Sequence, residues 1–136
     1  MDPKRLIKPA NEDSEQIAVM CWAAKHRSRY PCLQWLHHIP NGGNRSAREG
    51  ATFKAMGVKS GISDLHLPYP GRGFHGLMIE MKHSAIGLSI IAKAKMVSQE
   101  QQNYVDYLLA NGYAAGVCYG YDEAIAAIKW YLMMED

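Results

Sequence analysis

Two short segments carry ionisable residues inside apolar, strand-like surroundings. Asp64 stands in segment 61–67, and Glu80 and Lys82 stand in segment 77–82. Strand side chains alternate between faces, so Glu80 and Lys82 share one face of their strand while their neighbours point the other way. Buried charges need a partner charge or a metal ion. Two carboxylates and a lysine on neighbouring strands therefore predict a divalent-cation site with a cationic helper, an arrangement that suits hydrolysis of a phosphodiester.

Helices and further strands must position these residues. Hydrophobic spacing, turn residues and helix-capping signals define the expected elements. We expect a helix from Glu12 to about Arg29, a short strand from Leu33 to Ile39, a helix over 46–56 with Ser46 as its N-cap, strands over 62–67 and 75–82, a helix over 98–111, a strand over 114–119 and a final helix that Asp122 caps.

The order of these elements predicts an α/β fold. A strand over 75–82, a helix over 98–111 and a strand over 114–119 form a βαβ unit, so we expect a central mixed β-sheet flanked by helices. The connection over 83–97 reads as irregular. Residues 1–11 are polar with two prolines and read as a flexible arm before a single domain over 12–136.

Composition restricts the class of protein. The 136 residues carry a net charge of only +2, and the three cysteines are scattered without metal-site spacing, so we expect reduced thiols in the cytoplasm, or in the host cytoplasm for a viral protein. No apolar run approaches the roughly 20 residues that span a bilayer, so we expect no membrane partner. Within residues 25–59 basic residues far outnumber acids, which suits a phosphate backbone or a solvated face.

Several motifs, taken in order, resemble one nuclease family. They are Ile39-Pro40-Asn41-Gly42-Gly43 with Arg45 nearby, the stretch from Gly57 to Leu65, the stretch from Gly76 to Lys82, Ser98-Gln99-Glu100-Gln101, and Gly112-Tyr113. This series resembles the VRR-NUC branch of the PD-(D/E)xK nuclease superfamily over most of the chain. One position departs from the family pattern, because Ser63 stands where proline usually precedes the aspartate. The change removes a backbone constraint but no metal ligand.

The resemblance implies a restriction-endonuclease-like core and a Mg²⁺ or Mn²⁺ cofactor. It assigns the cation to the carboxylates of Asp64 and Glu80, with the backbone carbonyl of Met81 as a further ligand. Lys82 is expected to orient the attacking water or to stabilise charge on the phosphoryl oxygens.

The family also carries a glutamate on its first helix and a glutamine near its catalytic centre. The resemblance implies that this glutamate is a catalytic residue and a further metal ligand. Glu12 and Glu15 both qualify for it, and Glu12 is favoured because it stands four residues before Gln16, as in the family motif. Gln101 qualifies for the glutamine, although a glutamine three residues after Ser98 is also expected from helix capping alone.

The resemblance also implies contacts with DNA. Asn41, Gly42 and Arg45 form a loop expected beside the active site, and Lys93 and Lys95 are expected to grip DNA from the connection over 83–97. The predicted activity is metal-dependent, structure-selective cleavage of branched DNA, such as Holliday junctions, by a homodimer, because a two-fold symmetric junction requires two related active sites. The alternatives are a restriction-like or nicking endonuclease on duplex DNA and a non-catalytic DNA-binding module on the same scaffold.

Overall fold

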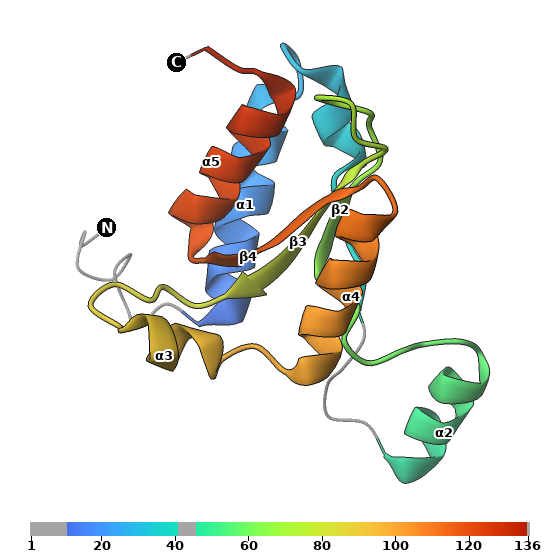
Figure 1. Ribbon diagram of the computed structural model, residues 1–136. Helices are drawn as coiled ribbons and strands as arrows, with labels where there is room; N and C mark the ends of the chain where they lie inside the picture. Colours follow the sequence, from blue (N-terminus) through green and yellow to red (C-terminus); the bar gives the residue numbers. More distant parts are fainter. Residues whose placement is uncertain (1–10, 41–45, 136) are drawn as a thin grey trace, which may run out of the picture.

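A mixed β-sheet organises the chain, as the computed structural model shows for residues 11–40 and 46–135 (Figure 1). Within these residues the sheet has four strands in the order β1-β2-β3-β4: β1 (His37–His38), β2 (Leu65–Leu67), β3 (Leu77–Lys82) and β4 (Ala114–Tyr119). The first three strands run antiparallel to their neighbours, and β3 and β4 are parallel. The predicted mixed α/β sheet is confirmed.

The parallel pair depends on a long crossover connection. From the end of β3 the chain passes through α3 (Ile90–Ala94) and α4 (Gln99–Ala110) before it enters β4. The Ser98 side chain caps α4 by accepting a hydrogen bond from the Gln101 backbone, and Gly112 ends the connection with φ +87°. This is the predicted βαβ unit, and it places α4 against β4.

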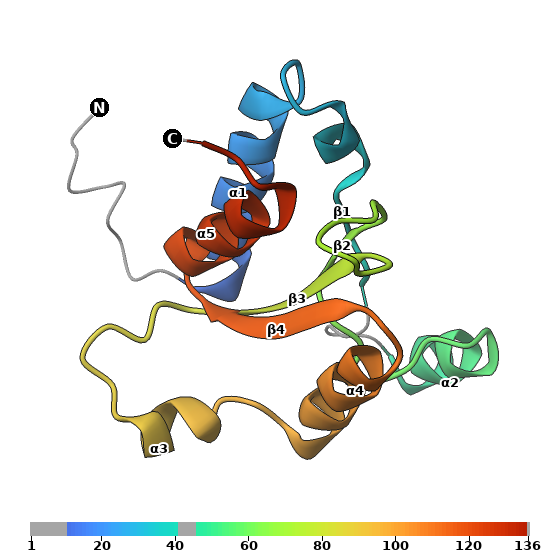
Figure 2. The ribbon, with the colours of Figure 1, turned by 45° about the horizontal axis from the view of Figure 1, so that its top comes forward.

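Two helices from opposite ends of the chain cover one face of the sheet. Both ribbon views show α1 (Glu12–His26) beside α5 (Tyr121–Leu132), with α4 on the other side of β4 (Figures 1 and 2). The apolar core lies between this helix pair and the sheet, and it includes Val19, Leu65, Ile79, Met81, Ala124, Ile128 and Tyr131. No helix in the described part of the chain is long and apolar enough to cross a membrane.

The central strand β3 is buried along its whole length. Leu77, Ile79 and Met81 belong to the apolar core, whereas the alternating residues Glu80 and Lys82 do not. The two ionisable side chains are nevertheless buried, with only 3% and 7% of each residue exposed. The alternation predicted from the sequence therefore places a carboxyl group and an ammonium group side by side on the covered face of β3.

The prediction of a strand from Leu33 to Ile39 is wrong over most of that range. Residues Pro31–Trp35 form the 3-10 helix η2, and the strand β1 holds only two residues. Pro31 occupies the first turn, where its fixed φ suits a helix. Leu33 and Leu36 are buried while Trp35 is 65% exposed, which follows the three-residue period of a 3-10 helix rather than the two-residue period of a strand.

Two further boundaries differ from the expectation. The segment over 83–97 contains the short helix α3, because the Ser89 side chain caps it by accepting a hydrogen bond from the Ala92 backbone. The last helix begins at Tyr121, with Gly120 as its N-cap, and Asp122 lies in its first turn. Gly120 has φ +95°, and an added Cβ atom would lie 3.0 Å from Glu15 Oε2, so glycine is required there.

The other helices match their expected positions. α1 ends at His26, three residues before Arg29, and α2 (Ala47–Ala55) begins after Ser46, whose side chain accepts a hydrogen bond from the Glu49 backbone. α2 has no buried residue and projects from the rest of the fold (Figure 1). Of the expected arm, residues 1–10 lie outside the described part of the chain.

Gly61 provides a test of how the turn before β2 packs against α4. Its φ is +84°, and an added Cβ atom would lie 2.7 Å from the backbone carbon of Glu100. Gly61→Ala should therefore lower the free energy of unfolding by about 3 kcal/mol, through a strained backbone and a steric clash, as measured by urea denaturation. Gly57→Ala is the matched control, because Gly57 has φ +102° but open space around it. Equal losses in the two variants would show that α4 does not constrain this turn.

Candidate active site

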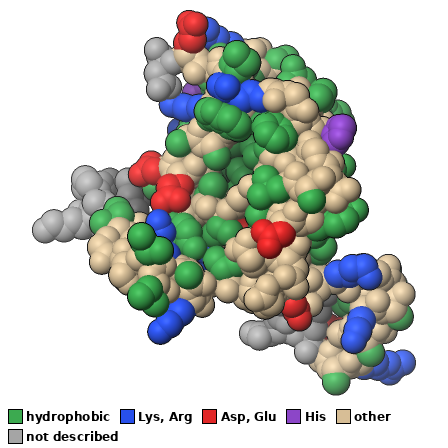
Figure 3. All heavy atoms as spheres, viewed as in Figure 1, with side chains coloured by type: hydrophobic (Ala, Val, Ile, Leu, Met, Phe, Trp, Pro, Cys, Tyr) green, Lys and Arg blue, Asp and Glu red, His purple; other side chains and the backbone are tan. Residues whose placement is uncertain are grey.

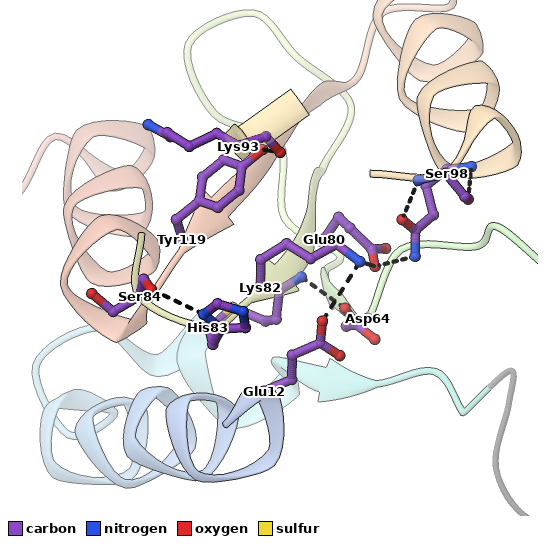
Figure 4. A network of polar contacts seen from close by, with 11 residues as sticks. Glu12, Asp64, Glu80, Lys82, His83, Ser84, Lys93, Ser98 and Tyr119 are labelled. Atoms are coloured by element: carbon purple, nitrogen blue, oxygen red, sulfur yellow. Dashed lines mark hydrogen bonds and ion pairs between the residues drawn. The ribbon is translucent and has the colours of Figure 1, made fainter. Parts of the chain in front are cut away.

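Two neighbouring strands bring Asp64 beside Glu80. The register pairs Leu65 with Ile79 in antiparallel strands, so Asp64 lies level with Glu80. Asp64 Oδ2 accepts a hydrogen bond of 2.7 Å from the backbone N–H of Met81. This bond fixes the Asp64 carboxylate against β3 and holds the two acidic groups together (Figure 4).

Lys82 lies between two carboxylates. Its Nζ atom is 3.6 Å from Oε1 of Glu12, at the first residue of α1, and 3.7 Å from Oε1 of Glu80. The Lys82 side chain is only 9% exposed, whereas the Glu12 side chain is 52% exposed. Glu12 is therefore the solvent-exposed member of this cluster, and Lys82 is a buried member.

Gln101 contacts the cluster from α4. Its Nε2 donates a hydrogen bond of 2.8 Å to Glu80 Oε1, and its Oε1 accepts one of 3.0 Å from the backbone N–H of Ser98. The sequence left open whether this glutamine caps the helix or contacts the acidic centre. The structure shows that one side chain makes both contacts, since its two ends face different partners.

Glu80 is the electrostatic centre of the cluster. Burial raises the pKa of its carboxyl group to about 8; repulsion from Asp64 acts in the same direction, and the Lys82 ammonium group opposes both. Its Oε2 atom is buried and has no hydrogen-bond partner among the described residues. A buried carboxyl oxygen without a partner, next to a second carboxylate, is an arrangement that a divalent cation stabilises.

The donor atoms of the cluster fit a hard cation. Asp64 and Glu80 offer carboxylate oxygens, the ligands that Mg²⁺ and Mn²⁺ take, and Mg²⁺ keeps several waters when few protein ligands are present. Among residues 11–40 and 46–135, no group of three or more His, Cys, Asp or Glu side chains is arranged to hold a metal ion. A cation here would thus rest on two carboxylates, with the Met81 carbonyl and water as the remaining oxygen donors.

The structure separates the two candidate glutamates of α1. Glu12 reaches Lys82, whereas Glu15 is 5% exposed and accepts a hydrogen bond from the backbone N–H of Tyr121. The carboxylate of Glu15 therefore lies at the N-terminus of α5, where the helix dipole favours negative charge. Of the two, Glu12 is the one in contact with the cluster.

Of the predicted DNA-binding residues, the structure describes two and leaves three outside the described part of the chain. Lys93 lies in α3 with its Nζ atom 4.7 Å from the centre of the Tyr119 ring, and Lys95 is exposed at the C-cap of that helix. Asn41, Gly42 and Arg45 lie outside the described residues.

Tyr119 is a neighbour of the cluster that the sequence reasoning did not single out. It ends β4, and the parallel register places it level with Lys82. Its hydroxyl donates a hydrogen bond of 2.9 Å to the backbone carbonyl of Lys93. The position of Tyr119 could have been predicted from the βαβ unit, because parallel strands of equal length bring their last residues to the same edge of the sheet.

These observations define an α/β protein in which two neighbouring acids, Asp64 and the buried Glu80, lie beside the buried Lys82 at the end of a central strand. The VRR-NUC domain model matches residues 10–122. A solved structure described as a VRR_NUC domain protein is 32% identical in sequence, with a TM-score of 0.73, and the match covers 95% of this chain and 93% of that one. No match is found among curated protein sequences. The chain belongs to the VRR-NUC family, a family of nuclease domains.

The raised pKa of Glu80 predicts a pH-dependent stability in metal-free buffer. The folded protein holds a proton on this carboxyl group up to about pH 8, whereas the ordinary pKa is 4.5. The stabilisation is therefore full below pH 4.5 and is lost as the pH rises through 8. Thermal unfolding of Glu80→Gln, measured over the same range in EDTA, should lack this part of the decline. An identical pH profile in the variant would contradict the assignment.

Because Glu12 and Glu15 lie in different environments, the same substitution should affect stability at Glu15 and activity at Glu12. Glu15→Gln weakens a buried contact to α5 and should lower the free energy of unfolding by about 1–2 kcal/mol. Glu12→Gln removes a half-exposed charge and should change stability by less than about 1 kcal/mol, while impairing any chemistry that depends on Lys82. Urea denaturation and a nuclease assay on both variants separate the two roles. The reverse pattern would assign the functional glutamate to Glu15.

Proposed function

We propose that this protein is a divalent-metal-dependent endodeoxyribonuclease that acts on branched DNA, such as four-way junctions, as a homodimer. The observation that carries the proposal is the convergence of Asp64, Glu80 and Lys82 at the covered end of β3, with Glu80 Oε2 lacking a partner among the described residues. Membership of a nuclease domain family supports the same conclusion. The cofactor of this proposal is Mg²⁺ or Mn²⁺.

Each residue of the cluster has a distinct part in the proposed hydrolysis. A divalent cation, when bound, supplies a water of lowered pKa and neutralises charge on the phosphate. Asp64 and Glu80 would hold the cation through their oxygens, and the hydrogen bond from Met81 keeps Asp64 in place. Lys82 presents its ammonium group to the attacking water or to the phosphoryl oxygens, where negative charge develops.

Glu12 and Gln101 act in this scheme as positioning residues. Glu12 and Glu80 hold the Lys82 ammonium group from two sides, which limits its freedom before DNA arrives. Gln101 donates to Glu80 Oε1 and leaves Oε2 available for the cation. The capping box of α4 fixes the amide orientation of Gln101, so the start of this helix also sets the position of the acid.

The preference for branched DNA and the homodimer rest on symmetry. A four-way junction has two-fold related strands, and cutting both of them requires two active sites related by the same axis. A C2 homodimer provides such a pair. Light scattering of the purified protein should therefore give twice the mass of one chain, and a monomer at working concentrations would contradict this part of the proposal.

A cleavage panel tests the activity and the choice of substrate together. Four-way junctions, flaps and linear duplexes of the same sequence are incubated with Mn²⁺, Mg²⁺ or EDTA at several salt concentrations. Junctions and flaps should be cut with either metal, and EDTA should stop the reaction. Equal cleavage of the linear duplex would favour a restriction-like or nicking enzyme, whereas intact DNA in every arm would leave a non-catalytic DNA-binding module.

Substitution of Asp64 tests the assigned metal site. Asp64→Ala should lower the cleavage rate by at least about a thousandfold, because several kcal/mol of transition-state stabilisation depend on the bound cation. DNA binding should be unchanged or tighter, since a carboxylate that repels phosphate has been removed. Asp13→Asn, at an exposed acid in the first turn of α1, is the control and should cleave normally. Persistent cleavage by Asp64→Ala would place the metal elsewhere.

A further inference from the structure

A cavity of about 480 Å³ opens between α3, α4 and the end of β4. Its walls include Ile90 and Lys93 of α3, Val97, Gln102 of α4, and Val117 and Tyr119 of β4. On the face shown in Figure 3, hydrophobic side chains gather over α3 and toward α4, with lysine at their edge. The volume lies within the range of pockets that bind small organic groups.

The cavity lies directly beside the candidate active site. The parallel register places Val117 level with Glu80 and Tyr119 level with Lys82, so these side chains share one face of the sheet. Neighbouring strands are about 4.8 Å apart, and Gln101, which donates to Glu80, lies next to Gln102 in α4. A group bound in the cavity would therefore be adjacent to a phosphate that lies over the cluster of Asp64, Glu80 and Lys82.

The lining combines apolar walls with polar groups at the rim. Ile90, Val97 and Val117 give aliphatic surfaces, and Tyr119 adds an aromatic ring. Gln102 is exposed, and its side-chain amide is oriented by a 2.8 Å hydrogen bond to Asp106 Oδ1. A nucleobase matches this distribution, because its faces are apolar and its edge carries hydrogen-bonding groups.

The contact between Lys93 and Tyr119 holds the two walls together. Tyr119 donates a hydrogen bond to the Lys93 carbonyl, and the Lys93 ammonium group lies over the Tyr119 ring at 4.7 Å. These contacts tie the short helix α3 to β4. They also make a cationic side chain part of the cavity lining, where it would favour a DNA strand whose base enters the cavity.

We propose that this cavity is a subsite for one unpaired nucleobase of the DNA strand that is cut, adjacent to the scissile phosphate. The inference rests on the proposed nuclease function and adds a basis for its selectivity. A paired base must leave the stack to enter the cavity, whereas a base at a branch point or bulge has less pairing and stacking to lose. The subsite thus favours DNA that carries an unpaired nucleotide at the cut site.

The test uses the full chain and DNA with one unpaired 2-aminopurine beside the cut position, in EDTA so that no cleavage occurs. Fluorescence anisotropy reports DNA binding, and 2-aminopurine emission reports whether the base leaves its stack. Wild-type protein should raise the emission on binding. Val117→Phe fills the cavity and should raise the Kd for this DNA about tenfold, with loss of the emission change, while the Kd for fully paired duplex stays constant.

Two further variants control for misfolding and for added bulk. Ala94→Trp narrows the cavity from an exposed position of α3 and should act like Val117→Phe. Leu109→Phe adds a ring at a 51% exposed position of α4 outside the cavity and should act like wild type. Unchanged emission on wild-type binding, or unchanged affinity in both cavity variants, would overturn the subsite. Cleavage with Mn²⁺ that persists in either case would leave the nuclease function standing.

Discussion

The buried carboxyl group of Glu80 is the constraint around which the site is built. It lies on a strand whose six residues are all buried, and its neighbour on the same face is the ammonium group of Lys82. Charges removed from water are stable only when their partners are fixed in place. The surrounding elements supply those partners: α1 contributes Glu12, the turn before β2 contributes Asp64, and α4 contributes Gln101. The sheet and the helices are thus joined by the same polar contacts that form the site.

Several polar contacts link the site to the stability of the helices. Glu15 binds the N-terminus of α5, one turn along α1 from Glu12, so the packing of α1 against α5 also directs Glu12 toward Lys82. Gln101 closes the capping box of α4 with the same side chain that contacts Glu80. Because positioning and folding share these residues, the geometry of the acidic centre is set before any substrate arrives.

Features that depend on local pattern could be read from the sequence. The alternation around Glu80 predicted which side chains of β3 enter the core, and the serine and glutamine at 98 and 101 predicted the start of α4. The 3-10 helix η2 was missed because a short apolar run can be buried with a period of two or of three residues. The choice between Glu12 and Glu15 required tertiary structure, since both lie on one helix face and only the place of α5 separates them. The cavity beside Tyr119 also escaped prediction, because its walls come from three elements whose packing against one another the sequence pattern does not define.

Proton release on metal binding tests the central claim most directly. Calorimetric titration of Mn²⁺ into the protein at pH 7, in two buffers with different heats of ionisation, measures how many protons leave as the cation binds. Since burial and Asp64 raise the pKa of Glu80 to about 8, one bound Mn²⁺ should release about one proton from the wild-type protein and none from Glu80→Gln. Binding without proton release, or equal release from the variant, would contradict a cation held by Glu80 and Asp64.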